Sequence, residues 1–144
     1  MNDIERALSY LKEGYSCSQS ILLTYRKRFG ISRENAIKFA SSFGGGIGGM
    51  GDICGAVSGA FMAIGLKYGK TNIDEKGINE KSYEKVREFV EKFKGINGAI
   101  KCNDLLGYDI STSEGRQLAK EKNIFKTVCP KAVQTSAEIL EELL

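Results

Sequence analysis

The sequence predicts an all-α fold, a single-domain bundle of about six to eight helices. Apolar residues recur at helical spacing along most of the chain; in the first segment Ile4, Ala7, Leu8 and Leu11 share one face. Capping residues and glycines separate such segments, and no stretch alternates long enough to predict a strand. No linker or internal repeat divides residues 1–144, so we expect one domain.

A polar N-cap and a terminal glycine bound each of the first three expected helices. The cap side chain accepts hydrogen bonds from free backbone N–H groups, and glycine adopts the left-handed conformation that ends a helix. With their boundary residues, these helices are expected from Asn2 or Asp3 to Gly14, from Ser16 to Gly30, and from Ser32 to Gly44.

Similar signals mark the later helices. Asp52 is expected to cap a fourth helix that continues to about Tyr68, and the charged segment from Thr71 to Ser82 is expected to contain a loop. Further helices are expected from Tyr83 to a stop at Gly95, over Cys102–Leu106 before Gly107, from Ser111–Glu114 onward, and from Pro130, as a first helical residue, to Leu144.

The charge balance argues against a nucleic-acid or anionic-membrane surface. Net charge is +3, Lys and Glu are interspersed, and the run Arg26–Arg28 is typical of a solvated helix face. The apolar run Ile53–Leu66 is too short to insert across a membrane, and no secretory signal is visible at residues 1–14. We therefore expect a cytoplasmic protein with reduced cysteines, for which metal binding or redox chemistry is more common than a structural disulfide.

The chain contains no histidine. This absence excludes Ser-His-Asp hydrolysis, Cys-His proteolysis, histidine-bound zinc and covalent haem attached through Cys-x-x-Cys-His. Chemistry near neutral pH must come from cysteines, carboxylates, lysines or a bound cofactor.

The four cysteines are far apart in the sequence, at Cys17, Cys54, Cys102 and Cys129, and form no Cys-x-x-Cys pair. Three or all four are expected at helix starts, with Cys129 as an N-cap before Pro130. Free N–H groups and the helix dipole favour a thiolate there, and the thiolate is both nucleophile and metal ligand. The same cysteines also fit the role of small buried apolar residues, so both interpretations stay open at this point.

Glycines surround Cys54. The stretch Gly46–Gly51 matches G-x-G-x-x-G, but a helix precedes it and no strand follows, so nucleotide binding is disfavoured. Gly51, Gly55 and Gly59 instead recur every four residues, which gives a smooth face for close approach of a helix or a cofactor.

Four motifs in this order resemble the C_GCAxxG_C_C family of redox-active proteins. They are Gly14–Cys17 (Gly-Tyr-Ser-Cys), Cys54–Gly59 (Cys-Gly-Ala-Val-Ser-Gly), Cys102–Gly107 (Cys-Asn-Asp-Leu-Leu-Gly) and Cys129-Pro130, and the resemblance covers nearly the whole chain. It implies a redox site formed by the four cysteines. A related domain occurs in split-Soret cytochrome c, which holds haem and an iron–sulfur centre. Only the cluster part of that comparison carries over, because this chain cannot attach the haem.

Three hypotheses follow for these cysteines. The leading one is that Cys17, Cys54, Cys102 and Cys129 together bind an iron–sulfur cluster for electron transfer or redox sensing, with zinc as a structural alternative. The second is a metal-free thiol–disulfide oxidoreductase with Cys54 as nucleophile and Cys17 as partner thiol. The third is a non-redox helical module that binds a ligand or partner helix. The redox partner is unknown, and homodimerisation is an open alternative.

Other candidate site residues have simpler explanations. Asp52, beside Cys54 in the sequence, is expected to be a helix cap. Asp104 and Asp109, near Cys102, are typical of turns and caps, and Tyr15 of an amphipathic core position.

Overall fold

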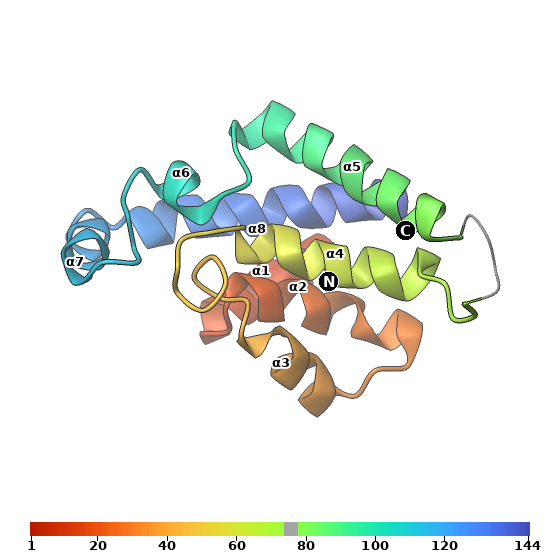
Figure 1. Ribbon diagram of the computed structural model, residues 1–144. Coiled ribbons are helices and arrows are strands. Elements are labelled where there is room, and N and C mark those ends of the chain that lie inside the picture. The colour runs from red at the N-terminus through yellow and green to blue at the C-terminus, as the bar shows by residue number, and fades with distance from the viewer. Residues whose placement is uncertain (74–77) are drawn as a thin grey trace.

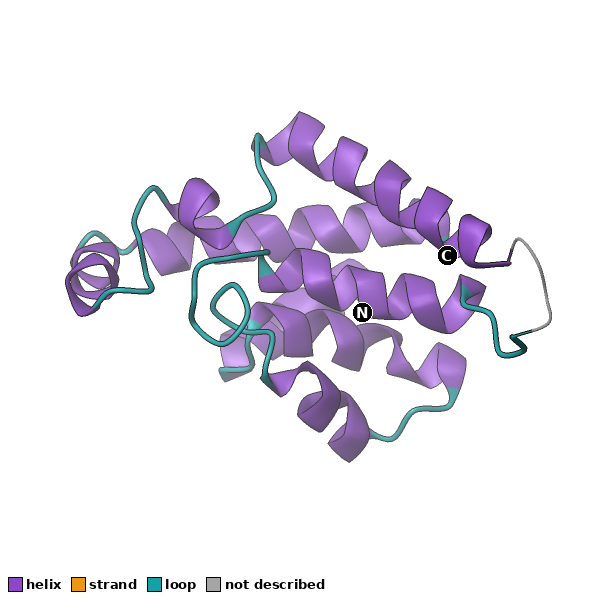
Figure 2. Ribbon diagram, viewed as in Figure 1, coloured by secondary structure: helices purple, strands orange, loops and turns teal. Residues whose placement is uncertain are grey.

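The computed structural model describes residues 1–73 and 78–144. In these ranges the secondary structure is helical apart from one isolated bridge, which confirms the all-α prediction (Figures 1 and 2). No helix within them is both long and apolar enough to span a bilayer. The elements are α1 (Asp3–Glu13), α2 (Cys17–Tyr25), the 3₁₀ helix η1 (Arg26–Phe29), α3 (Arg33–Ser41), α4 (Gly55–Tyr68), α5 (Ile78–Asn97), α6 (Cys102–Leu106), α7 (Ser113–Glu121) and α8 (Ile124–Leu143).

Helix α4 occupies the centre of the bundle and contacts α2, α5 and α8 (Figure 1). It is apolar on nearly every side, as expected for a helix surrounded by others. Helices α1 and α3 pack against α2. The central core includes the buried side chains of Ile21, Tyr25, Val57, Ile64, Phe89, Phe93, Val133 and Leu140.

Two glycines allow α4 to lie against α2. A Cβ at Gly55 would be 2.8 Å from the backbone nitrogen of Ser18, and a Cβ at Gly59 would be 2.9 Å from its carbonyl oxygen. Real side chains essentially never approach backbone this closely. The glycine repeat therefore serves helix packing, which brings the start of α4 beside the start of α2.

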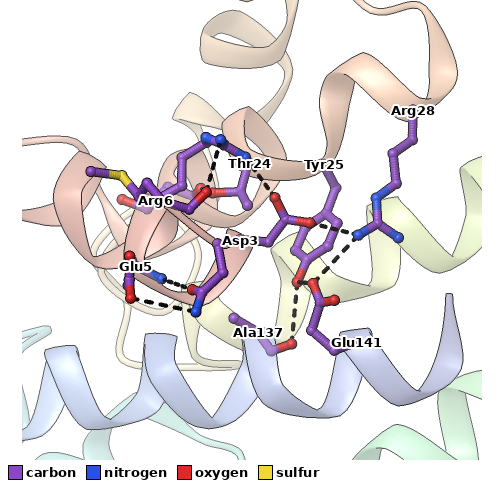
Figure 3. Close-up of polar contacts among 11 residues, drawn as sticks. Asp3, Glu5, Arg6, Thr24, Tyr25, Arg28, Ala137 and Glu141 are labelled. Carbon is purple, nitrogen blue, oxygen red and sulfur yellow. Dashed lines mark hydrogen bonds and ion pairs between the residues drawn. The ribbon is translucent and has the colours of Figure 1, made fainter.

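A polar network joins α1, α2 and α8 (Figure 3). Arg28 forms ion pairs with Asp3 at 2.6 Å and with Glu141 at 3.4 Å. The buried Tyr25 hydroxyl has two acceptors, the carboxylate of Glu141 at 3.0 Å and the carbonyl of Ala137 at 3.2 Å. Burial and the Glu141 charge raise the pKa of Tyr25, so the phenol remains protonated as a donor.

Most predicted helix starts are confirmed. Side chains of Asn2, Ser16, Ser32 and Thr112 accept backbone hydrogen bonds as N-caps, and α6 has the predicted bounds. At the other end of α1, Gly14 adopts the expected left-handed conformation.

Several predicted boundaries were wrong, among them the stop at Gly44, since α3 ends at Ser41. Asp52 does not cap α4: its N–H donates to Gly46 and its carbonyl accepts from Cys102, and Cys54 is the N-cap. Helix α5 begins at Ile78, inside the expected loop, and passes through Gly95, because Phe89 and Phe93 anchor it in the core. Residues 74–77 of that expected loop lie outside the described part of the chain.

Pro130 is not a first helical residue. Helix α8 starts at Ile124, after Asn123 in a left-handed conformation, and Pro130 lies inside it. The first turns of α8 persist ahead of the proline because Ile124, Phe125 and Val128 pack on the cluster of Leu106, Ile110 and Ala119. Cys129 is therefore an interior helix residue and not an N-cap.

Candidate functional site

All four cysteines line one cavity of about 690 Å³. Their elements meet at one end of the bundle, where the coiled loop before α4 lies near α6 and the first turns of α8 (Figure 1). The rest of the lining is Leu8, Leu11, Lys12, Ser16, Gly45, Gly46, Gly55, Leu105, Leu106, Phe125, Lys126, Val128, Pro130 and Ala132. The cavity is therefore mainly apolar, and no carboxylate from the described part of the chain lines it.

A capping box fixes Cys17 as the first residue of α2. The Ser16 hydroxyl accepts from the Gln19 N–H at 3.3 Å, and the Gln19 side chain accepts from the Ser16 N–H at 3.1 Å. Gly55 lies directly opposite, since a Cβ there would be 3.1 Å from the Cβ of Cys17. The tight contact between α2 and α4 thus brings Cys17 close to Cys54.

A short antiparallel bridge places Cys54 beside Cys102. Ile53 pairs with Lys101, so the residues that follow each of them are the two cysteines. The Cys54 N–H donates to the carbonyl of Ile100 at 2.8 Å, and the Cys102 N–H donates to the carbonyl of Asp52 at 2.7 Å. These backbone bonds connect two chain segments that are far apart in sequence.

The glycine-rich loop before α4 covers this bridge. Gly46 has φ +69°, and a Cβ there would be 2.7 Å from the Cβ of Cys102. Gly51 has φ +74°, and the Asn103 side chain occupies the space that a Cβ would need. Asn103 in turn accepts from the Ile110 N–H at 2.9 Å and donates to Asp109 at 3.0 Å. The loop therefore requires glycine both for its backbone conformation and for close packing on α6.

Burial and interactions among the cysteines shift the pKa values of the four thiols. Burial raises the pKa of Cys54 to about 11, although the nearby N–H groups of Ala56 and Val57 lower it, and burial raises the pKa of Cys102 to about 12. A hydrogen bond from the Cys17 thiol to the Cys129 sulfur raises the pKa of Cys17 and lowers that of Cys129. Charges on the other three cysteines also raise the pKa of Cys17, so the four groups act on one another.

This arrangement changes the order of the candidate nucleophiles. Cys54 is only 5% exposed and has a raised pKa, both of which disfavour a reactive thiolate. Cys129 is the cysteine whose pKa falls, although it lies inside a helix. Cys129 was expected to favour a thiolate as an N-cap, but its pKa falls because it interacts with Cys17.

The thiols do not form a compact single-ion site. Among the described residues, no group of three or more Cys, Asp or Glu side chains is arranged to hold one metal ion. The four cysteines share a cavity but form no such group.

The other predicted site residues separate into two groups. Gly55 lines the cavity, whereas Gly51 packs on Asn103 and Gly59 on Ser18 and Ile21, away from the cavity. Asp52 contributes backbone hydrogen bonds, and the Asp109 carboxylate accepts from Ser111 in a turn. Neither Asp104 nor Tyr15 lines the cavity.

Sequence reasoning missed the loop glycines and the two lysines of the cavity lining. Gly45 and Gly46 have positive φ and line the cavity, and Gly46 packs against Cys102. Their position in a run of glycines was the available signal. Lys12 and Lys126 carried no such signal, because the chain contains many lysines at solvated helical positions.

The family comparison agrees with this geometry. The family model described as "Putative redox-active protein (C_GCAxxG_C_C)" matches residues 15–143. The chain belongs to this family. The family is described as redox-active, and in this member the four cysteines share one cavity.

One relative is an uncharacterized protein of Archaeoglobus fulgidus. It is 32% identical to this chain over 107 residues, which cover 69% of this chain and 71% of the relative. No solved structure matches the chain.

Proposed function

We propose that the four cysteines hold one iron–sulfur cluster in the shared cavity and that the chain uses it for electron transfer or redox sensing. The cavity lined by Cys17, Cys54, Cys102 and Cys129 is the observation that carries this proposal. Four cysteine thiolates are the usual ligand set of two-iron and four-iron clusters, and the ligands need not be close in sequence.

Burial makes the thiols of this cavity costly to ionise. Cys17, Cys54 and Cys102 remain protonated at neutral pH, because the interaction with Cys129 raises the pKa of Cys17 and burial raises the pKa values of Cys54 and Cys102. Metal binding requires thiolates and displaces their protons, so bound iron offsets the cost of charging these buried sulfurs. The same burial leaves the bare thiols weak nucleophiles.

A bound cluster supplies one-electron redox chemistry. The chain's own residues would hold and shield it. Leu105, Leu106 and Phe125 form an apolar wall that limits access of water, and solvent exclusion around a metal site influences its potential. The close packing of Gly46 on Cys102 fixes that ligand against the loop.

A single zinc ion fits this arrangement less well. Zinc–sulfur bonds of about 2.3 Å hold four sulfurs tightly around one centre, and the described residues contain no such group. A cluster distributes its cysteine ligands over several iron atoms and therefore accepts a wider arrangement.

Metal-free thiol–disulfide chemistry is the second candidate. It is favoured by the interaction between the thiols of Cys17 and Cys129, which lowers the pKa of Cys129. Oxidation of this pair to a disulfide transfers two electrons and two protons to a peroxide or disulfide acceptor. In this version Cys129, and not Cys54, supplies the attacking thiolate.

Anaerobic purification followed by metal analysis separates the two candidates. The cluster proposal predicts coloured protein with absorption near about 400 nm and two or four iron atoms per chain with matching acid-labile sulfide. Colourless, metal-free protein that gains a Cys17–Cys129 disulfide with peroxide would overturn it in favour of thiol chemistry. Zinc without iron or sulfide would contradict both.

A further inference from the structure

The four-cysteine cavity is larger than its thiols require. Its volume of about 690 Å³ lies within the range of about 300–1,000 Å³ typical of sites for small organic molecules. The cavity extends from the cysteines past Leu8 and Leu11 of α1 and past Phe125 and Val128 of α8. Apart from Phe125, these side chains are not part of the apolar wall assigned above to the cluster.

The charged residues that line this cavity are positive. Among the residues that the structure describes, the charged ones in its lining are Lys12, in the last turn of α1, and Lys126, in the first turn of α8. Both are exposed, and neither forms an ion pair with any residue of the described ranges. No carboxylate of residues 1–73 or 78–144 lines the cavity, so two ammonium groups without an ion pair in these ranges flank an apolar cavity.

We infer that this cavity binds, beside the thiols, a small organic anion with an apolar body. The body packs between the α1 leucines and Phe125, and the anionic group lies between Lys12 and Lys126. Apolar burial supplies most of the affinity, as in ligand sites generally, and the lysines select the charge. This binding goes beyond the proposed redox function and involves no electron transfer.

A matched set of probes tests the charge preference. 2-Naphthoate, naphthalene-2-carboxamide and naphthalen-2-ylmethanamine share one apolar ring system and are anionic, neutral and cationic at pH 7.5. Calorimetry on the full chain, purified without oxygen and with whatever metal it holds, should show 2-naphthoate binding about tenfold more tightly than the amide. No binding of the cationic amine should be detected.

Lysine variants assign the selectivity to residues. Lys12→Gln and Lys126→Gln should each weaken 2-naphthoate binding about two- to fivefold, the range for an exposed ion pair, and leave amide binding unchanged. Lys94→Gln, on α5 and outside the cavity lining, is the control and should have no effect. These surface changes leave the core intact, so lost binding would not reflect unfolding.

Thiol protection locates the ligand. In the reduced, metal-free chain, 2-naphthoate should slow iodoacetamide labelling of Cys17 and Cys129, as followed by mass spectrometry. Equal binding of the three probes, insensitivity to both lysine variants, or unprotected cysteines would overturn the inference. Binding to the metal-free chain alone would also overturn it, because the anion would then occupy the place of the cofactor. Iron and sulfide content reports on the redox proposal separately.

Discussion

The backbone nitrogen of Cys102 donates a hydrogen bond to the carbonyl oxygen of Asp52 at 2.7 Å. This contact and its neighbour, from Cys54 to Ile100, join two segments almost fifty residues apart. They place Cys54 beside Cys102 in the lining of the cavity, which also includes Cys17 of α2 and Cys129 of α8. The glycine-rich loop packs closely on this junction. Substitution of its glycines is therefore the first test of the site.

Replacing Gly46 by alanine should disturb the cysteine site as well as the loop. The new Cβ would be 2.6 Å from the nitrogen of Asp52 and 2.7 Å from the Cβ of Cys102. We expect Gly46→Ala to lower the free energy of unfolding by about 1–3 kcal/mol more than Gly48→Ala, and to reduce cofactor content. Gly48 is a matched control, because it also has positive φ but open space at its Cβ. Equal effects in urea denaturation would show that the contact with Cys102 is unimportant.

The glycines of α4 offer a second comparison within one helix. Gly55→Ala should destabilise the fold by about 1–3 kcal/mol, because the added methyl group meets Ser18 and Cys17. Gly65→Ala has open space and should stabilise the helix by about 0.5–1 kcal/mol. Chemical denaturation measures both. A neutral or stabilising Gly55→Ala would contradict the close packing of α4 on α2.

The sequence predicted local features well because their causes are local. Helix caps such as Ser16 and Ser32 bind neighbouring N–H groups, and helical periodicity indicated the buried faces. Tertiary contacts decided what was missed. Asp52 was assigned to a cap, but its backbone pairs with Cys102, and Pro130 was assigned to a helix start, but packing of Phe125 extends α8 ahead of it.

The sequence predicted which cysteines form the candidate site, but it did not predict how they are arranged in space. The motifs around Cys17, Cys54, Cys102 and Cys129 indicated one site, but nothing in their spacing gives the bridge between Ile53 and Lys101. The interaction of Cys17 with Cys129 depends on how α2 and α8 pack. The sequence could not rank the thiols, because the contact between Cys17 and Cys129 and the burial of Cys54 and Cys102 set their pKa differences.

Removing the Tyr25 hydroxyl should loosen the contact between α2 and α8. Tyr25→Phe leaves Glu141 and the carbonyl of Ala137 without their buried donor, so we expect a loss of about 1–3 kcal/mol in unfolding free energy. Tyr83→Phe is the control, since that ring is exposed and should change stability by less than about 0.5 kcal/mol. Indistinguishable variants would rule out a stabilising role for this hydroxyl.

The metal-free, reduced chain should lose stability in alkaline solution. The folded pKa of Cys54 is about 11 against an ordinary value of 9.0, so the folded state favours the protonated thiol. Its contribution is full below pH 9 and is lost as the pH rises through 11, at a rate approaching about 1.4 kcal/mol per pH unit. Cys54→Ala should flatten this dependence between pH 9 and 11 in denaturation measurements. An unchanged slope would show that Cys54 titrates normally in the folded chain.

The most direct test of the shared four-cysteine site is iron content per chain in four single variants, Cys17→Ser, Cys54→Ser, Cys102→Ser and Cys129→Ser, all purified without oxygen beside the unaltered protein. If one cluster joins all four cysteines, each variant should lose most of its iron and sulfide or show an altered absorption spectrum, while far-ultraviolet circular dichroism confirms that it remains helical. A folded variant that keeps the full iron content and an unchanged spectrum would contradict a site built from all four.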